Sequence, residues 1–227
     1  MVSGHGVIRW AGYVWHVKNA TSLNPGPNAY SMANVRVNRK GLSMSIVKRN
    51  GTWTCSEVWL FANQSLGFGT YEFQVTGRPD RFDQNVVLGL FNFPPPQVGP
   101  SGTNEIDIEI AQWGQPKNNR MNYAVYPPKL GPKYEHMKRE FKLNDTASTH
   151  CFTWTQKGVH FQSYYGYGRN EQHLLAEWNF APEDWEGRIP QTPIPANMNL
   201  WLNSGKAPSN DKPVRIVIKS FTFTPQA

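Results

Sequence analysis

The stretch from Thr103 to Trp113 constrains both the fold and the chemistry of this chain. Within it acidic and isoleucine side chains alternate: Glu105, Asp107 and Glu109 share one parity, and Ile106, Ile108 and Ile110 share the other. A period of two is the period of a β-strand, so the three carboxylates are predicted on one face and the three isoleucines on the opposite face. The isoleucines therefore predict the buried side of a sheet.

The acids need a further explanation, because Asp and Glu are poor strand formers and like charges along one face repel. Carboxylates roughly 7 Å apart, in a cleft of effective dielectric near 20, repel by about 2 kcal/mol per pair. This repulsion is expected to raise at least one pKa by more than a unit, so that ionised and protonated members coexist near neutral pH. One carboxylate nucleophile and one carboxylic acid are the groups that glycoside hydrolysis requires.

Two other interpretations of the acidic row remain open. It could be an idle polar face, although such faces usually mix in Lys, Arg, Thr or Ser. It could be a Ca²⁺ site, although such sites usually draw on loop carbonyls and Gly-rich turns, which this stretch lacks. We favour catalysis by the row, and we expect neither a metal nor a cofactor.

The length of 227 residues, with 18 Pro and 19 Gly, predicts a single all-β domain over residues 1–227. Segments with strand character are separated by turn signals and show no helical periodicity, which favours two packed antiparallel sheets. Only the segment from Pro182 to Glu186 is expected to form a short helical turn. Strands are predicted at residues 10–18, 35–38, 42–47, 52–60, 70–76, 85–93, 105–110, 120–126, 137–143, 149–156, 159–165, 174–178, 198–202 and 214–223.

Turn chemistry marks several connections between these strands. Asn50-Gly51 is the strongest hairpin signal, and Arg39-Lys40-Gly41 is another. The Pro-rich segment from Pro94 to Gly102 cannot join a sheet, so it is predicted to be the loop that leads into the acidic strand.

The formal net charge of +7 raises the question of a polyanionic partner. The basic pairs Arg39-Lys40, Lys48-Arg49 and Lys138-Arg139 are scattered, whereas nucleic-acid binding would need a gathered patch. We interpret them as solvated surface, with attraction to an acidic polysaccharide or cell wall as the lesser possibility. No apolar run is long enough to span a membrane, so we expect neither a nucleic-acid nor a membrane partner.

The cysteines and histidines do not form a metal-binding or disulfide pattern. Cys55 and Cys151 are the only cysteines, and we interpret them as two buried free thiols, although a bond between them stays open. His150 lies within a strand-like segment and is expected to be a hydrogen-bonded structural residue rather than a base.

The motif Glu-Ile-Asp-Ile-Glu resembles the signature of family-16 glycoside hydrolases, in the form found in bacterial lichenases and xyloglucan-active members. The resemblance covers roughly residues 10 to 224. It is carried by Glu105–Glu109, Trp53–Glu57, Leu66–Tyr71, Asn122-Tyr123, Ser148–Trp154 and Met198–Trp201, in the family's order.

The resemblance implies a β-jelly-roll sandwich whose concave face forms the substrate cleft. It also implies that Glu105 is the nucleophile and Glu109 the acid/base, with Asp107 holding the nucleophile between them. The implied activity is a retaining endo-β-glucanase acting on β-1,3-1,4- or β-1,3-linked glucan. Xyloglucan or galactan hydrolysis, transglycosylation and a non-catalytic polysaccharide-binding sandwich remain alternatives.

Further residues are candidates for binding the sugar chain. Glu57, Asn122 and Trp201 match cleft positions of lichenases, and Trp59 and Trp113 lie beside matched segments. Tyr30, which follows a Pro-Gly-Pro loop, could close one end of the cleft. Each of these aromatic residues could instead pack in the hydrophobic core and not contact the sugar.

Two positions depart from lichenases. Thr103-Asn104 stands where they carry a Trp that stacks on the sugar, and Trp59 stands where they carry an Arg. We further expect an extracellular monomer whose signal peptide is absent from this sequence.

Overall fold

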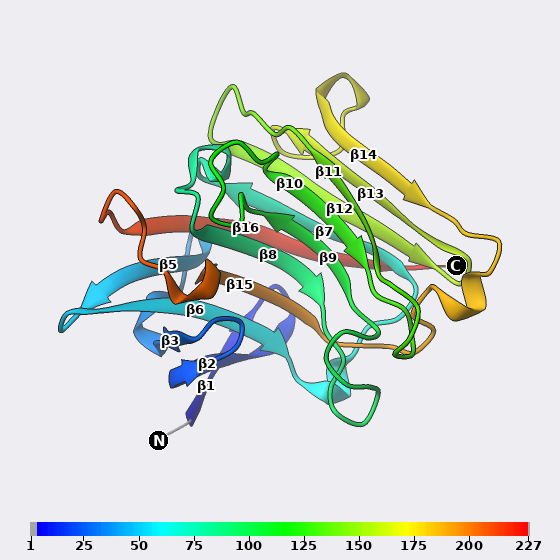
Figure 1. Ribbon diagram of the computed structural model, residues 1–227, viewed down its shortest axis with the longest axis horizontal. Helices are drawn as coiled ribbons and strands as arrows, with labels where there is room; N and C mark the ends of the chain where they lie inside the picture. The colour runs from blue at the N-terminus through cyan, green and yellow to red at the C-terminus, as the bar shows by residue number, and fades with distance from the viewer. Residues whose placement is uncertain (1–3, 227) are drawn as a thin grey trace.

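The computed structural model describes residues 4–226, which form sixteen β-strands joined by turns and short 3₁₀ segments (Figure 1). The strands are β1 (Gly4–Trp10), β2 (Tyr13–Leu23), β3 (Asn28–Tyr30), β4 (Val35–Asn38), β5 (Gly41–Arg49), β6 (Thr52–Leu60), β7 (Gly69–Thr76), β8 (Val86–Asn92), β9 (Ile106–Ile110), β10 (Met121–Val125), β11 (Glu135–Arg139), β12 (Ala147–Thr155), β13 (Gly158–Tyr165), β14 (Leu174–Phe180), β15 (Ala196–Leu202) and β16 (Val214–Pro225). The 3₁₀ segments are η1 (Met32–Asn34), η2 (Ala62–Gln64), η3 (Pro79–Arg81), η4 (Glu171–His173), η5 (Trp185–Gly187) and η6 (Asn203–Gly205).

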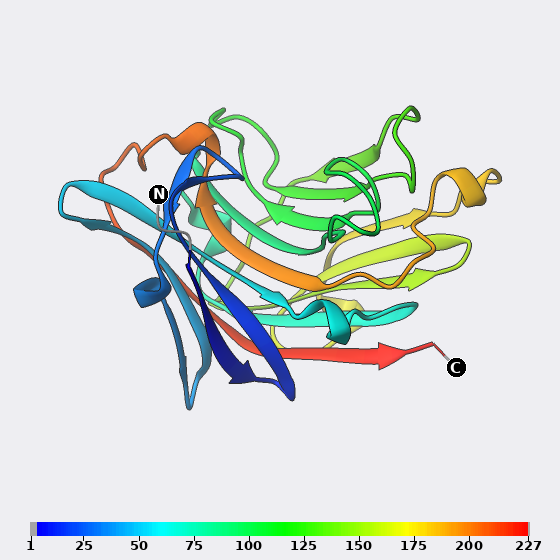
Figure 2. The ribbon, with the colours of Figure 1, turned by 90° about the horizontal axis from the view of Figure 1, so that it is seen from below.

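The strands form two stacked, curved layers, as Figure 2 shows. One layer has the order β11-β10-β9-β8-β15-β6, with β2 and β3 paired to β6 and β1 paired to β2. The other has the order β5-β16-β7-β12-β13-β14, with β4 beside β5. This arrangement confirms the predicted all-β jelly roll. The two layers are also hydrogen-bonded to each other, because the end of β5 pairs with the start of β6, from Val47 opposite Thr54 to Arg49 opposite Thr52.

The hydrophobic core lies between the layers and explains the isoleucine parity. Ile106, Ile108 and Ile110 are at most 1 % exposed, and each contributes roughly 1.5–3 kcal/mol through burial. Aromatic rings of the second layer pack in the same interior; Tyr71 and Phe152 stack with centroids 4.6 Å apart. Burial of the isoleucines turns the acidic residues of β9 to the opposite, concave face.

The strongest turn signals are confirmed, and one weaker turn was missed. Asn50 and Gly51 adopt φ angles of 47° and 81°, as a tight hairpin between twisted strands requires. The strand predicted at residues 10–18 is confirmed from Tyr13 onward, but its start is wrong, because β1 ends at Trp10 and β2 starts at Tyr13. Ala11 and Gly12 turn the chain there with positive φ angles, and apolar side chains on both sides conceal this turn in the sequence.

Two other predictions were corrected by the structure. The strand predicted at residues 137–143 corresponds to β11, which ends at Arg139. Beyond that residue the backbone at Leu143 is hydrogen-bonded by side chains and not by a neighbouring strand. The Asp80 carboxylate accepts from the Leu143 N–H at 3.1 Å, and the Arg78 guanidinium donates to the Leu143 carbonyl at 3.0 Å. The predicted helical turn is η5, but it is one of six 3₁₀ segments; three-residue turns leave no periodic pattern to detect.

The remaining local predictions concern the cysteines, His150 and membrane spans. Cys55 and Cys151 are free and buried, as predicted. His150 is fully buried, and its ring nitrogens lie 2.9 Å from Ser163 Oγ and 3.0 Å from Ser148 Oγ, which confirms a structural role. Within residues 4–226 no helix has the length and apolar character that a membrane span would need.

Candidate active site

The acidic row lies in the middle of the concave layer. Strand β9 pairs with β8 on one side and β10 on the other, and Glu105 directly precedes it, with its carbonyl accepting the Tyr126 N–H at 2.8 Å. Asp107 is 4 % exposed, and the flanking Glu105 and Glu109 are half-buried. All three carboxylates line one cavity of about 390 Å³.

Strand register identifies the neighbours of this row, because directly opposed residues on adjacent strands point to the same face. Two rows of side chains cross the layer at right angles to the strands. One consists of Asn122, Glu109, Gly89, Asn199 and Glu57; the next consists of Ala124, Asp107, Phe91, Asn197 and Trp59. The carboxylates therefore have amide side chains, aromatic rings and a further acid along the line perpendicular to β9.

Gly89 provides space beside Glu109. A Cβ atom on Gly89 would lie 2.3 Å from Asn199 Oδ1, so any side chain there would displace the amide. The Asn199 amide therefore occupies the space that a side chain at position 89 would take, in the same row as Glu109.

The three carboxyl groups have raised pKa values, and burial, not the predicted repulsion, is the largest cause for each. Burial and then repulsion from Glu109 raise the pKa of Glu105 to about 8, while a hydrogen bond with Asp107 opposes this rise. Burial and both neighbouring glutamates raise the pKa of Asp107 well above its usual range, and burial raises the pKa of Glu109 to about 7. The raised pKa values leave protons in the row at neutral pH, and the hydrogen bond favours the proton on Asp107 and negative charge on Glu105.

Glu57 lines the same cavity but is already paired with a lysine that sequence reasoning missed. Lys18 Nζ lies 3.0 Å from each Glu57 carboxylate oxygen and 2.5 Å from the Asn24 carbonyl oxygen, and it is 4.4 Å from the centroid of the Tyr30 ring. Both side chains of the ion pair are nearly buried, at 11 % and 12 % exposure. Burial raises the pKa of Glu57, and the attraction of Lys18 opposes that rise.

Tyr30 does not lie in the cavity wall. It is buried, and its hydroxyl donates to the Pro25 carbonyl at 2.8 Å, so it supports the loop from beneath. The loop itself, through Asn24 and Pro25, lines the cavity. Thr103 and Asn104, where lichenases carry a Trp, are also buried, and Asn104 binds the carbonyls of Pro127 and Pro128.

Trp59 and Trp201 each line a hollow of the concave layer. Trp59 lines a hollow with Phe93 and Pro94 that shares Glu57 and Lys18 with the cavity, and its ring stacks on His16 at 5.1 Å. Trp201 lines the cavity itself. Its indole N–H and the Asn199 Oδ1 are buried and have no hydrogen-bond partner among the side chains and backbone of residues 4–226.

Asn122 and Trp113 lie beside the cavity without lining it. The Asn122 amide nitrogen donates to the carbonyls of Glu109, Ala111 and Arg120 at 2.9–3.2 Å, and its oxygen accepts from Trp113 Nε1 at 3.1 Å. Strand β9 ends at Ile110, so the regular strand that would carry Trp113 onto the concave face is absent. Trp113 instead adopts a φ of 56° and packs edge-on against Trp201, with centroids 6.1 Å apart.

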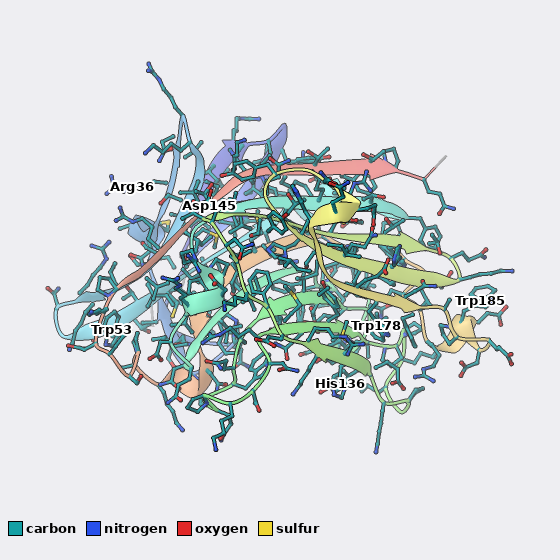
Figure 3. The ribbon with its side chains drawn as sticks, turned by 90° about the horizontal axis from the view of Figure 1, so that it is seen from above. Arg36, Trp53, His136, Asp145, Trp178 and Trp185 are labelled. Carbon is teal, nitrogen blue, oxygen red and sulfur yellow. The ribbon has the colours of Figure 1, made fainter. Side chains whose placement is uncertain are left out.

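Several cavity residues were not identified from the sequence. They are Lys18, Asn24, Pro25, Phe91, Phe93, Ser101, Gly102, Tyr126, Asn197 and Asn199. A usable signal existed for part of this set, because Asn197 and Asn199 share the parity of Trp201. Tyr126 had no such signal; it stacks on Tyr134 at 4.5 Å, next to His136 at the edge of the layer (Figure 3).

The arrangement can hold and transfer protons and can bind polar, ring-shaped groups. Across residues 4–226 no cluster of three or more His, Cys, Asp or Glu side chains is arranged to hold a metal ion. Amides, an indole and aromatic faces surround the carboxyl row.

Comparison with known proteins identifies the fold. Neither a family model nor a curated protein matches the sequence. Solved structures do match. A β-glucanase of Bacillus licheniformis is 19 % identical, with a TM-score of 0.66 and 100 % of both chains covered.

Two further structures match over most of their length. A laminarinase from Flavobacterium sp. UMI-01 is 12 % identical, with a TM-score of 0.70 and 92 % of each chain covered. A glycoside hydrolase family 16 endo-glucanase from Bacteroides ovatus is 12 % identical, with a TM-score of 0.66 and coverage of 92 % and 94 %. The chain therefore has the jelly-roll fold of the family-16 glycoside hydrolases.

Proposed function

We propose that this protein is a retaining endo-β-glucanase that cleaves β-1,3-1,4- or β-1,3-linked glucan. The observation that carries the proposal is the row Glu105, Asp107 and Glu109, which lines a cavity with raised pKa values in the middle of the concave layer. Proteins that share the fold are named β-glucanase, laminarinase and endo-glucanase, which supports the same substrate class.

Each acid has a separate role in the proposed double displacement. Glu109 gives its proton to the glycosidic oxygen as the bond to the leaving sugar breaks, and the Glu105 carboxylate forms a bond to the anomeric carbon. Glu109, now ionised, takes a proton from water, whose oxygen displaces Glu105 with the configuration retained. Protonated Asp107 donates to Glu105, which keeps negative charge on the nucleophile.

The geometry of the strand bears on this mechanism. Four residues of strand separate the α-carbons of Glu105 and Glu109 by roughly 13 Å. Retaining enzymes hold their carboxyl groups about 5–5.5 Å apart, so the side chains must lean toward each other across Asp107. The curvature of the concave layer favours that approach (Figure 2).

The surroundings of the row support binding of a neutral sugar chain. The Asn197 and Asn199 side chains line the cavity as partners for sugar hydroxyl groups, and the faces of Phe91, Phe93 and Trp59 suit the C–H surface of a sugar. The rows that cross the layer allow a chain to bind at right angles to β9. A polymer of this kind is met outside the cell, so we also propose an extracellular site of action.

The proposal is tested by reducing-sugar release from barley β-glucan, laminarin, curdlan, xyloglucan and agarose, with linkage analysis of the products. Cleavage of barley β-glucan or laminarin, abolished in Glu105→Gln, is the expected result. Preferential cleavage of xyloglucan or agarose would contradict the proposed substrate but leave the proposed mechanism in place. Binding of a glucan without cleavage of any member of the panel would overturn the enzymatic proposal.

A further inference from the structure

A second pocket, of about 540 Å³, lies beyond the end of β9 and has a strongly positive lining. It is formed by η3, the segment that joins β9 to β10, and the segment after β11. Its charged members are five cations and two carboxylates, which leaves an excess of three positive charges: Arg78, Arg81, Lys117, Arg120, Lys142, Asp80 and Glu140.

The two carboxylates neutralise only part of this positive charge. Asp80 is committed to Arg78, which binds both of its oxygens at 2.7 and 2.8 Å, and it also accepts from the backbone of Leu143. Glu140 is exposed and forms no ion pair within the described part of the chain. The same is true of Arg81, Lys117 and Lys142 within residues 4–226.

Arg120 distinguishes this pocket from ordinary solvated surface. Its guanidinium is half-buried and donates to the Phe82 carbonyl at 2.8 Å, while Asp80 and Asp83 act on it only at longer range. Burial lowers the pKa of Arg120, which means that its positive charge has lost hydration. A partly desolvated cation without a directly bound anion favours an anionic ligand at its remaining N–H groups.

The pocket wall is held by internal hydrogen bonds. Gln112 Nε2 donates to the carbonyls of Pro116 and Asn118 at 2.6 and 3.1 Å, and Asn118 Nδ2 donates back to the Gln112 carbonyl at 3.2 Å. The Ala111 N–H donates to the Arg120 carbonyl at 2.8 Å. These bonds fix the backbone that carries Lys117 and Arg120, so little order need be gained when a ligand binds.

We propose that this basic pocket binds a sulfate or carboxylate group carried by a polysaccharide. Arginine suits both groups, because its planar fork of donors matches two of their oxygens at once. The pocket wall begins at Gln112, two residues beyond the end of the strand that carries the acidic row. A neutral glucan carries neither group, so the carrier is an acidic polysaccharide other than the glucan proposed for the cavity. The oxyanion site stands on its own observations, whereas the choice of a polysaccharide as carrier rests on the proposed function.

The test compares two triple variants that lose the same charge. R81Q/K117Q/K142Q removes exposed cations of the pocket and leaves Arg78 and Arg120, which hold backbone carbonyls. R9Q/R39Q/K40Q removes exposed cations elsewhere and is the matched control. Binding to dextran sulfate and to neutral dextran of equal length is measured by calorimetry at one fixed ionic strength, because salt screens such contacts.

The pocket variant should bind dextran sulfate at least tenfold more weakly than the wild type, and the control variant should lose less than twofold. Neutral dextran should not distinguish the proteins. Equal losses of affinity in both variants would mean that the polymer is attracted by the overall positive charge of the protein, which would overturn the proposal. Unchanged affinity in the pocket variant would overturn it as well.

Two further measurements separate the carrier and the proposed function. Sodium sulfate that binds as tightly as the sulfate groups of the polymer would make the free ion the ligand and contradict a polysaccharide carrier. Hydrolysis of neutral glucan is measured on the same variants and should be unchanged. Dextran sulfate binding that depends on the pocket, in a protein that cleaves no glucan, would retain the oxyanion site and reject the glucanase.

Discussion

Two buried polar clusters of this molecule differ in how their charges are resolved. The first is the acidic row of β9, where burial and mutual repulsion raise the pKa values. The second, the His150 cluster, consists of Ser148, His150, Ser163 and Tyr123, from β12, β13 and β10. There Tyr123 donates to Ser163 Oγ at 2.7 Å, and both nitrogens of the His150 ring have a serine partner.

The difference lies in charge: the His150 cluster holds neutral groups, whereas the acidic row holds three carboxyl groups. Burial lowers the pKa of His150 to about 3, so the ring is neutral and its hydrogen bonds are complete. The acidic row reaches no such state at neutral pH. Ionising every member brings like charges together, and pKa values of about 7 and 8 lie too close to neutral for every member to keep its proton. Hydrogen-bonded neutral groups stabilise the fold, whereas strained titratable groups in a cavity are typical of sites that perform chemistry.

The largest expected effect comes from neutralising the acidic row. Glu105→Gln and Glu109→Gln should each lower turnover on the substrate glucan by at least about 10²–10⁴-fold, because each removes a group that takes part in bond making or proton transfer. The free energy of unfolding should stay the same or rise, since a source of repulsion is lost. Turnover and chemical denaturation are measured together, with Glu183→Gln on the exposed surface as the control.

The two roles can also be told apart. With azide present, Glu105→Ala should convert an activated β-glycoside to the α-glycosyl azide, because azide replaces the missing nucleophile. Glu109→Ala should yield the β-azide, because the glycosyl-enzyme still forms on Glu105. The reverse product anomers would exchange the roles of Glu105 and Glu109. Near wild-type turnover in either Gln variant would contradict the proposed mechanism.

Breaking the His150 cluster should have the opposite profile, with a loss of stability and preserved turnover. His150→Ala is expected to lower the free energy of unfolding by about 3 kcal/mol, because it opens a cavity and leaves the Ser148 and Ser163 hydroxyls without partners. His160→Ala, which removes an exposed contact with Glu177 at 2.7 Å, should cost less than about 1 kcal/mol. A His150 variant that keeps its stability but loses turnover would contradict the contrast between the clusters.

Lys18 shares features with both clusters. Its buried charge has hydrogen-bond partners, as the groups of the His150 cluster do, and it lines the cavity that contains the acidic row. Lys18→Met should cost about 2 kcal/mol of stability, since Glu57 is left buried without its cation and the Asn24 carbonyl loses its donor. KM for the glucan should rise as the loop at Asn24 loosens. The double variant Lys18→Met/Glu57→Gln should recover part of the stability, and equal losses in the single and double variants would show that the pair is not coupled.

The smallest effect, a shift of a few degrees in Tm, concerns the dependence on pH. The glutamates of the row bind protons more tightly in the folded protein than their ordinary value of 4.5 allows. Their stabilising contribution is therefore full below pH 4.5 and is lost as the pH rises through about 7 to 8. His150 has the opposite sign: its contribution is present above 6.5 and is lost as the pH falls toward about 3.

Melting curves between pH 4 and pH 9 can separate these contributions. The double variant Glu105→Gln/Glu109→Gln should flatten the decline in Tm on the alkaline side, and His150→Ala should flatten the decline on the acid side. One kcal/mol corresponds to about 2–4 °C for a chain of this size. Variants that retain the wild-type slope on both sides would show that these groups do not set the pH dependence.

Much of the local structure was predictable from the sequence because it depends on neighbours along the chain. The alternation in Glu105–Ile110 determined which side chains enter the core and which reach the concave face. The Asn50-Gly51 turn and the Pro-rich loop before β9 followed from the backbone preferences of those residues. Such preferences act over a few residues and need no partner strand.

Only the tertiary structure decided what surrounds the acidic row. Glu57 meets Lys18, Glu109 lies opposite Gly89, and Asn199 lies between Gly89 and Glu57, because strands distant in the sequence pair in one particular register. Trp113 does not line the cavity, because β9 ends at Ile110 and the Trp113 indole N–H donates to Asn122. A strand's own pattern selects its two faces, but its register against another strand depends on how both bury their apolar sides, which no single segment contains.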